Sequence, residues 1–225
     1  MQKIRKILID GATELGLALD EVAIDRLLAY RGFLKEYNKK VNLTSIVDDE
    51  EIIVKHFLDS MTVLPDINTG TKIIDIGTGA GFPGVVLKIA REDLDLVLVD
   101  STRKKIVFLK ELLEALVLKD VESIHARAED LLRQRPDFSN GFDYAVSRAV
   151  ARLSKLAEYC LPYVKVGGEF IAMKGRNYKE ELDESRKTIK SLGGEISSVK
   201  EVTLPGSDIV HSIIRIKSKN SQKIG

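Results

Sequence analysis

The sequence predicts an α/β fold: a mostly parallel sheet that ends in an antiparallel hairpin, preceded by an N-terminal helical extension. From Thr71 onward, short apolar runs of β type alternate with helical patterns, which is typical of a parallel sheet covered on both faces. A glycine-rich turn at 77–84 connects the first strand to a helix, as in nucleotide-type sites. A Pro-Gly turn at 205–208 separates the last two strands, which indicates a hairpin.

Composition bounds the class of protein. The chain has 225 residues, of which 44% are hydrophobic and 31% charged, and its net charge is +1. These values favour one large globular domain, or one domain with an appendage. The single cysteine excludes an internal disulfide, and no Cys/His cluster has metal-ligand spacing. No apolar run approaches the roughly 20 residues that span a bilayer. We therefore expect a cytoplasmic protein without metal or membrane segment, most simply a monomer.

Residues 1–66 are expected to form the helical extension and to pack on a core domain at 67–220. The expected helices of the extension span 4–15, 20–37 and 50–64. Gly16 is a stop signal for the first helix, and Asp20 suits the N-cap of the second because its carboxylate accepts from free backbone N–H groups. The third helix is expected to end before Pro65, because proline disfavours helical geometry in the preceding residue.

The core domain is expected to contain seven strands. In chain order they span 72–76, 95–99, 121–124, 143–147, 168–173, 195–203 and 209–217. The expected helices between them span 84–91, 102–117, 128–134, 151–160 and 178–192. The closing hairpin is unlike the symmetric arrangement of dinucleotide-binding domains.

The glycine loop matches two cofactor patterns. Gly79, Gly81 and Gly84 spell G-x-G-x-x-G, and Asp100 follows Gly79 by 21 residues, at the end of the second strand. This is the spacing of the ribose-binding acid in a NAD site. Read from Asp75, the same loop is Asp-x-Gly-x-Gly-x-Gly, the order typical of methyltransferases that use S-adenosylmethionine (AdoMet). A glycine match alone does not decide between them.

Three further features favour AdoMet. Asp75 places a negative charge at the strand end, where a pyrophosphate would be repelled, whereas AdoMet carries an ammonium and a sulfonium and no phosphate. Glu129 follows the third strand, where an acid suits the adenine edge. The closing hairpin is the third feature. The structural alternatives are a helix-capping or buried acid at 75 and an ordinary first-turn acid at 129.

Several motifs extend over nearly the whole chain in order. They are YNKKVNLTS, HFLDSM, DIGTGAGFPG, VDSTRKKIVFL, SRAVA, CLP and MKG. With them the sequence resembles the bacterial RsmG (GidB) family of 16S rRNA methyltransferases. The resemblance implies the class I AdoMet-dependent methyltransferase (Rossmann-like) fold. It also implies methyl transfer from AdoMet to N7 of a guanine, conventionally guanine 527, in a single-stranded loop of 16S rRNA in the 30S subunit or its assembly precursor.

The resemblance also implies a set of cofactor contacts, and the acid at the end of the first strand adds Asp75 to them. The predicted cofactor-binding residues are Asp75, Gly77, Gly79, Gly81, Phe82, Asp100, Ser101, Ala128, Glu129 and Arg148. The segment up to Leu15 and the tail after Lys217 are less diagnostic of the family.

The chemistry of guanine N7 requires little from the protein. N7 carries a lone pair and no proton, so positioning and electrostatics suffice and no general base is assigned. The Asn/Asp-Pro-Pro-aromatic motif of exocyclic-amine methyltransferases is absent after the fourth strand. Cys160 precedes Leu161-Pro162 at a helix end and is expected to be buried and inert. Arg148 and Lys174 are the candidates for guanine positioning, with an ion pair to a nearby acid as the alternative for Arg148.

Basic clusters beside expected strand ends predict contact with RNA phosphates. The candidates are Lys39, Lys40, Arg103, Lys104, Lys174 and Arg176. For Lys104, within a helix, a solvated face is an equal alternative. Phe82 and Tyr178 are candidates for stacking on a base, whereas Phe142 is expected in the core.

Three other functions stay open at this point. The first is a methyltransferase of the same fold that acts on a small molecule or a protein. The second is a NAD-dependent oxidoreductase, which the dual glycine match allows. The third is an AdoMet-binding sensor or scaffold without catalysis. The sequence also leaves open whether naked RNA or an assembled particle is the substrate.

Overall fold

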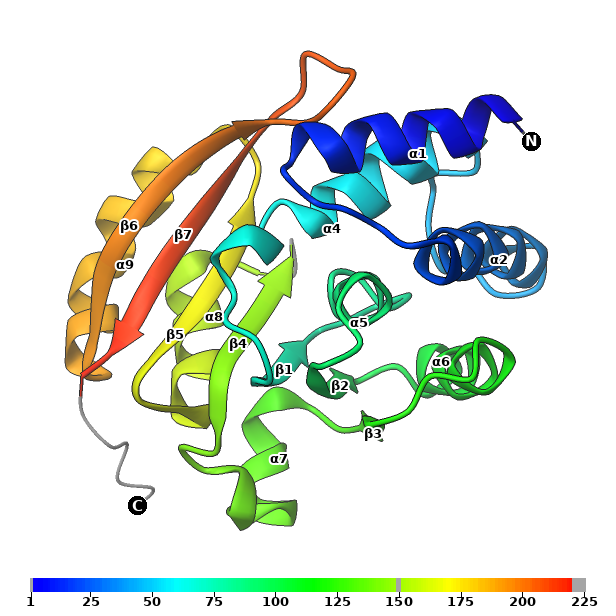
Figure 1. The fold of residues 1–225 in the computed structure, drawn as a ribbon. Helices are drawn as coiled ribbons and strands as arrows, with labels where there is room; N and C mark the ends of the chain where they lie inside the picture. Colours follow the sequence, from blue (N-terminus) through cyan, green and yellow to red (C-terminus); the bar gives the residue numbers. More distant parts are fainter. Residues whose placement is uncertain (1, 149–150, 220–225) are drawn as a thin grey trace.

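The computed structural model describes residues 2–148 and 151–219. The motif SRAVA, which includes 149 and 150, and the predicted domain end at 220 therefore lie partly outside the described residues. Within the described residues, seven strands form one sheet in the order β3-β2-β1-β4-β5-β7-β6 (Figure 1). The strands are β1 (Lys72–Ile76), β2 (Asp95–Asp100), β3 (Val121–His125), β4 (Phe142–Arg148), β5 (Val164–Lys174), β6 (Gly194–Thr203) and β7 (Val210–Ser218).

The strand directions confirm the predicted fold. The strands β3, β2, β1, β4 and β5 run parallel, and β7 runs antiparallel to both β5 and β6. The helices are α1 (Gln2–Glu14), α2 (Glu21–Asn38), α3 (Asp49–Ile52), α4 (Asp59–Met61), α5 (Gly84–Ala90), α6 (Arg103–Ala115), α7 (Ala128–Gln134), α8 (Leu153–Cys160) and α9 (Lys179–Ser191). Shorter turns are the π turn η1 (Ile53–Leu58) and the 3₁₀ turns η2 (Leu64–Asp66), η3 (Pro136–Phe138) and η4 (Leu161–Tyr163).

Alternating side chains of the central strands form two hydrophobic cores, one on each face of the sheet. Ile73 and Leu98 belong to the core shared with α5, α6 and the N-terminal helices. Ile74 and Val99 belong to the core shared with α7, α8 and α9. This alternation follows from the two-residue repeat of a strand, and burial on both faces explains why the strands read as continuous apolar runs. Figure 1 shows the helices on the two sides of the sheet.

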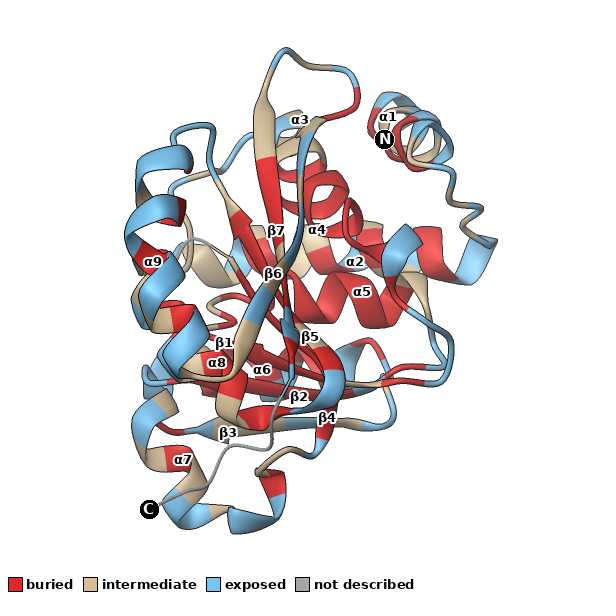
Figure 2. Cartoon of the chain, turned by 90° about the vertical axis from the view of Figure 1, so that its left-hand side faces the viewer, coloured by how far each residue is buried: buried red, intermediate tan, exposed pale blue. Residues whose placement is uncertain are grey.

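The helix α5 lies between the sheet and the N-terminal helices. Its residues from Gly84 to Ile89 are all buried, and it packs against α2 and α4 as well as β1 and β2. Figure 2 shows α5 as buried, whereas α9 exposes its outer side. Even Lys88 is only 1% exposed, and its ammonium donates to the carbonyl oxygens of Glu92 (2.8 Å) and Leu94 (2.6 Å). The N-terminal helices therefore add a third layer on this side.

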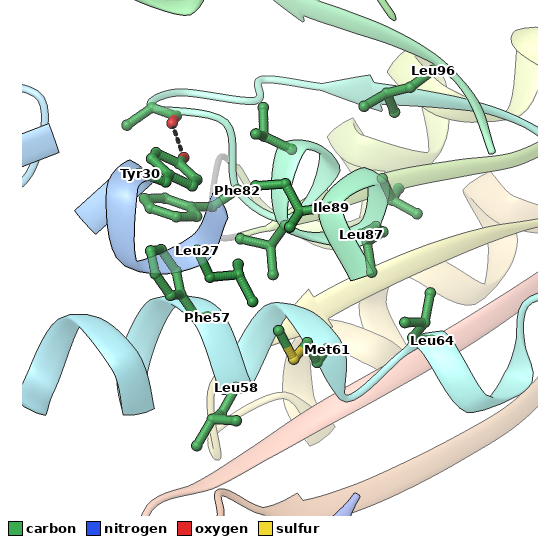
Figure 3. Packing of buried hydrophobic residues seen from close by; sticks show 14 of the residues in the cluster. Leu27, Tyr30, Phe57, Leu58, Met61, Leu64, Phe82, Leu87, Ile89 and Leu96 are labelled. Atoms are coloured by element: carbon green, nitrogen blue, oxygen red, sulfur yellow. Dashed lines mark hydrogen bonds between the residues drawn. The ribbon is translucent and has the colours of Figure 1, made fainter. Parts of the chain in front are cut away.

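Tyr30 of α2 joins the N-terminal helices to the loop after β1. Its ring stacks on Phe57 and Phe82, with centroid separations of 5.2 and 5.5 Å (Figure 3). Its hydroxyl donates a hydrogen bond to the carbonyl oxygen of Ala80. Because Tyr30 is fully buried, this bond satisfies a phenol and a carbonyl that water does not reach.

The third N-terminal helix differs from the expected regular helix over 50–64. It runs from Asp49 to Met61 and contains the π turn η1, and Pro65 lies in the 3₁₀ turn η2 instead of following the helix directly. The carbonyl oxygens of Lys55 and His56, within the π turn, accept hydrogen bonds from Arg148 at 3.2 and 3.5 Å. A π turn alters the internal hydrogen-bond pattern of a helix, and here its carbonyl groups face an outside donor.

The strand β5 begins at Val164, four residues before the predicted start. The predicted strand 168–173 starts at Gly168, whereas the observed strand also includes Gly167 and the three residues before it, and its pairing with β4 shifts register here. A Cβ on Gly168 would lie 2.4 Å from the carbonyl oxygen of Asp143, so only glycine fits this approach of two backbones.

The predicted boundary between 66 and 67 stays a prediction. Residues on both sides of it share one hydrophobic core, which includes Leu8 and Leu27 from the extension and Val85 and Leu98 from the sheet domain.

The Tyr30–Ala80 hydrogen bond gives a stability prediction. We expect Tyr30→Phe to lower the free energy of unfolding by about 1–3 kcal/mol, because it leaves a buried carbonyl without a donor. Tyr37→Phe is the matched control, because that hydroxyl contacts Glu111 at the surface and its loss should cost less than about 0.5 kcal/mol. Urea unfolding of both variants measures the difference, and equal costs would contradict the role given to Tyr30.

Candidate cofactor and substrate site

A cavity of about 700 Å³ opens at the carboxyl ends of β1, β2 and β4. Strand order reverses between β1 and β4, and open α/β sheets bind ligands at such a switch point. The predicted cofactor residues that line the cavity are Gly77, Gly79, Phe82, Asp100, Ser101, Ala128, Glu129 and Arg148. Asp75 and Gly81 are not on its wall. The structure therefore brings most of the predicted site together.

The glycines of the loop after β1 are required for different structural reasons. Gly77, Gly79 and Gly81 all have positive φ, at 74°, 63° and 99°, which strains other residues. Around Gly79 a Cβ would meet nothing closer than the Gly77 carbonyl oxygen at 4.0 Å, so this glycine leaves its side of the loop open to the cavity. At Gly81 a Cβ would lie 2.7 Å from Val85 and 2.8 Å from the Tyr30 hydroxyl. Gly81 thus serves packing behind the loop.

Asp100 fixes the loop from the end of β2. Its carboxylate accepts from the backbone N–H of Gly79 (2.9 Å) and of Thr102 (2.8 Å). The ammonium of Lys105 lies 3.6 Å from the same carboxylate. Asp100 is 5% exposed and lines the cavity, so its remaining lone pairs are available to hydroxyl donors of a ligand.

Asp75 lies behind the loop and is fully buried. One carboxylate oxygen accepts from the backbone N–H of Gly84 (2.8 Å), the first residue of α5, and the other has no hydrogen-bond partner within the described residues. Burial raises the pKa of Asp75 to about 7, although the Thr78 side chain and the Gly84 hydrogen bond oppose this shift. This placement favours the alternative of a buried acid that caps a helix, and direct cofactor contact by Asp75 stays a prediction.

The ends of β2 and β3 supply another part of the cavity wall. Ser101 is exposed, and its carbonyl oxygen accepts from His125 Nε2 at 3.0 Å. Ala128 begins α7, and its carbonyl oxygen accepts from the Tyr163 hydroxyl at 2.6 Å. Glu129 is exposed in the first turn of the same helix, so it is free to contact a ligand.

Arg148 is enclosed by the N-terminal helices at the end of β4. Its guanidinium lies 2.9 Å from a carboxylate oxygen of Asp59, which is 1% exposed. His211 of β7 donates to the other oxygen of Asp59 at 2.7 Å, and this hydrogen bond raises the pKa of His211. Arg148 also lies 4.9 Å from the centroid of Phe82 and lines the cavity. The ion pair predicted as the alternative is present, together with access to the cavity.

The predicted basic RNA contacts fall into two groups. Within the described residues, Lys40, Arg103, Lys104 and Arg176 form no ion pair, whereas Lys39 pairs with Glu36 at the surface (2.8 Å). Lys174 is 13% exposed, lies 2.9 Å from Glu181 and donates to the carbonyl oxygen of Ala151. It lines a separate hollow with Ala151 and Glu181, apart from Arg148. This speaks against both the RNA contact and the guanine positioning that the sequence suggested for Lys174.

The aromatic and sulfur candidates are mostly buried. Phe142 is fully buried, as expected, and Tyr178 is 8% exposed with its hydroxyl on Glu201, which leaves little ring surface for a base. Phe82 is 5% exposed and stacks on His56, with ring centroids 4.3 Å apart. Cys160 is fully buried, and burial raises the pKa of its thiol well above the usual value, which keeps it a thiol.

Comparison with known proteins decides the family. The family model described as "GidB: rRNA small subunit methyltransferase G" matches residues 23–210. The chain belongs to this family. A relative from Acetivibrio thermocellus, "Ribosomal RNA small subunit methyltransferase G", is 51% identical over 216 residues, which cover 96% of this chain and 88% of the relative. A relative of the same name from Alkaliphilus metalliredigens is 47% identical over 215 residues, covering 95% and 90%.

Solved structures agree on the fold. A SAM-dependent methyltransferase from Aquifex aeolicus has a TM-score of 0.57 at 18% identity and covers 81% of this chain and 98% of its own. TYW2 from M. jannaschii, solved in complex with AdoMet, has a TM-score of 0.57 at 12% identity, covering 71% and 74%. At these identities the similarity concerns the fold alone. The RsmG (GidB) resemblance and the class I methyltransferase fold predicted from the sequence are thus confirmed.

The cavity of this GidB-family chain fits AdoMet. Gly79 leaves room for close approach of a ligand to the backbone, and Asp100 offers carboxylate lone pairs suited to the hydroxyls of a ribose. Ser101 follows Asp100 on the cavity wall, and Ala128 and Glu129 lie after β3, where the sequence predicts contact with the adenine edge. Among the described residues no three His, Cys, Asp or Glu side chains are grouped to hold a metal ion. No helix in the described ranges is long and apolar enough to cross a membrane.

Sequence reasoning missed several residues of the cavity wall. They are Leu43, Thr44, His56, Lys105, Arg127 and Tyr159. Lys105 lies in the first turn of α6, five residues after Asp100, a proximity that was readable from the sequence. Thr44 and His56 lie in the motifs YNKKVNLTS and HFLDSM, but nothing local indicates that the fold brings the N-terminal extension to the cavity.

The buried acid behind the loop gives a pH prediction. The usual pKa of Asp75 is 3.8 and its folded pKa is about 7. Between these values the folded protein holds a proton that the unfolded chain has lost, so Asp75 contributes less stability as pH rises. Asp75→Asn cannot ionise and keeps an acceptor for Gly84. The melting temperature of this variant relative to wild type should therefore rise between pH 5 and pH 8, measured without ligand.

Asp93→Asn is the control for this measurement. Arg91 lowers the pKa of Asp93 to about 2, so Asp93 is ionised in both states throughout that pH range. Its substitution should change the melting temperature by the same amount at pH 5 and pH 8. A pH-independent difference for Asp75→Asn would contradict a buried acid with a raised pKa.

Proposed function

We propose that this chain transfers a methyl group from AdoMet to N7 of a guanine in the 16S rRNA of the small ribosomal subunit, conventionally guanine 527. The observation that carries the proposal is the family match over residues 23–210, which includes the cavity wall from Leu43 to Tyr159. At the level of the family description, rRNA small subunit methyltransferase, the predicted function is confirmed. The oxidoreductase alternative from the dual glycine pattern loses its support.

The protein's contribution to this reaction is positioning. AdoMet, when bound, supplies an electrophilic methyl group on a sulfonium. Guanine N7 has a lone pair and no proton, so the chain needs no general base. Gly79, Asp100 and Glu129 would hold the cofactor along the ends of β1, β2 and β3. Arg148, His56 and Phe82 close the cavity at the end of β4, where a base would be oriented.

Arg148 is rigid enough to orient a ligand. One terminal nitrogen of its guanidinium donates to Asp59 and to the carbonyl oxygen of Lys55, and the other donates to His56. Such a guanidinium loses little freedom when a substrate binds, which is the property that positioning requires. We therefore propose Arg148 for guanine positioning and not Lys174, which pairs with Glu181 and lines a different hollow.

The RNA would approach the end of the sheet at which the cavity opens, beside the carboxyl ends of the parallel strands. Lys40, Arg103 and Arg176 follow elements that end there, and Arg127, exposed at the start of α7, adds a cation on the cavity wall. Cations without internal partners are the ones that bind phosphates at low cost. We propose that the chain acts as a monomer in the cytoplasm on the 30S subunit or its assembly precursor.

Two measurements test the proposed function. Calorimetry should detect binding of AdoMet and none of NAD. Labelled AdoMet should then transfer its methyl group to 30S particles that lack the modification, and strand cleavage at 7-methylguanine should map the label to one guanine of 16S rRNA. Transfer to a small molecule or a protein, with none to rRNA, would overturn the proposal.

The RNA surface gives a prediction for binding at different salt concentrations. We expect Arg103→Ala and Arg176→Ala each to reduce the slope of log affinity for the 30S particle against log salt by about 1, because each removes one phosphate contact. Lys119→Ala is the matched control. Lys119 is exposed and has no ion pair within the described residues, but it precedes β3 and so lies at the amino-terminal end of the parallel strands, away from the cavity. Unchanged slopes for Arg103 and Arg176 would remove them from the RNA surface.

A further inference from the structure

Thr44 lines the cavity and is held there by one side chain. The amide oxygen of Asn38, at the end of α2, accepts from the backbone N–H of Leu43 (2.7 Å) and of Thr44 (3.1 Å). The amide nitrogen of Asn38 donates to the carbonyl oxygen of Thr44 (2.9 Å). Both backbone groups of Thr44 are therefore fixed, which places its side chain at a defined point of the cavity wall.

Arg148 sets the direction of the hydrogen bonds that reach Thr44. A guanidinium only donates, so His56 Nδ1, at 3.0 Å from Arg148, must be the acceptor. The ring proton of neutral His56 is then on Nε2, which donates to the hydroxyl oxygen of Thr44 at 2.9 Å. Burial, with a contribution from the charge of Arg148, lowers the pKa of His56 to about 3, so the ring stays neutral at physiological pH.

The hydroxyl oxygen of Thr44 has no acceptor capacity left. Besides His56 it accepts from the backbone N–H of Ile46 at 3.1 Å. A hydroxyl oxygen has two lone pairs and one proton. With both lone pairs in use, only the proton remains, and none of the described residues accepts it. The group therefore faces the cavity as a fixed hydrogen-bond donor.

We propose that Thr44 is a specificity-determining residue that donates this hydrogen bond to O6 of the target guanine. The proposal deepens the proposed function and rests on it. O6 and N7 are neighbours on the same edge of guanine, so a donor on O6 also places N7. Adenine carries an amino group at the corresponding position. This amino group is itself a donor, so it cannot accept the hydrogen bond from Thr44. The chain from Arg148 through His56 to Thr44 thus selects guanine and orients the atom that is methylated.

Location supports this role. Thr44, His56, Phe82 and Arg148 lie together on the cavity wall, whereas Asp100 at the end of β2 and Glu129 in the first turn of α7 belong to the part proposed to hold the cofactor. Hydrogen-bond readout also discriminates more strongly than apolar contact, because a mismatched base leaves a polar group of the site unpaired.

A two-by-two experiment tests the proposal. Wild type and Thr44→Val are compared on 30S particles that carry either guanine or 2-aminopurine, which lacks O6 and the N1 proton of guanine, at the target position. Each single change should lower kcat/KM for N7 methylation roughly tenfold, the range expected for one neutral hydrogen bond. The double change should cost no more than either single change, because both remove the same hydrogen bond. Thr44→Ser, which keeps the hydroxyl, should methylate guanine at close to the wild-type rate.

Controls separate this proposal from a general defect. Ser45→Ala removes an exposed neighbouring hydroxyl and should leave the rate unchanged. The affinity of Thr44→Val for AdoMet, measured by calorimetry, should equal that of wild type. The wild-type comparison of guanine with 2-aminopurine needs no variant and stands even if Thr44→Val folds poorly.

The outcomes that overturn the proposal are distinct. If Thr44→Val methylates guanine at the wild-type rate, or wild type does not discriminate against 2-aminopurine, the proposal is wrong while the proposed function stands. If the loss of kcat/KM for Thr44→Val on 2-aminopurine equals the product of the two single losses, Thr44 and O6 act independently and the proposal is also wrong. If wild type does not methylate guanine N7 in 30S particles at all, both the proposed function and this proposal fail.

Discussion

The enclosed guanidinium of Arg148 is the interaction on which the arrangement of the site depends. It belongs to the central strand β4, yet its partners come from the N-terminal extension: Asp59 and the carbonyl groups of the π turn. A charge removed from water in this way must be paired and hydrogen-bonded, and removal of one partner of such a pair costs about 3–5 kcal/mol. His211 brings the closing hairpin to the same carboxylate. One residue therefore fixes three parts of the chain relative to the cavity.

The loops and the helix end around the cavity are held in place by side chains that do not line it. Asp75 holds the first turn of α5, Tyr30 holds the Ala80 carbonyl, and Asn38 holds the backbone of Thr44. Gly81 allows this support, because a side chain there would collide with Val85 and Tyr30. Preorganisation of this kind suits a reaction that requires alignment and no proton transfer.

Most of the fold was predictable from the sequence because its signals are local. Alternating apolar runs, the glycine loop and the Pro-Gly turn each determine a short segment, and the strands and helices lie where those signals indicate. The site was predictable where it follows strand ends, as for Asp100 and Glu129. Thr44, the π turn and the Lys174–Glu181 pair were not, because each depends on contacts between segments distant in sequence or on burial that no local pattern encodes.

The position of Thr44 separates two tasks along the chain. The residues proposed to face the cofactor lie at or just after the strand ends of the sheet, whereas the proposed donor to the base, Thr44, lies in the loop after α2, in the N-terminal extension. If Thr44 selects the base as proposed, mutation in that loop alters which base is accepted without changing the residues proposed to hold the cofactor. In this architecture, substrate choice and reaction chemistry are free to evolve at different rates.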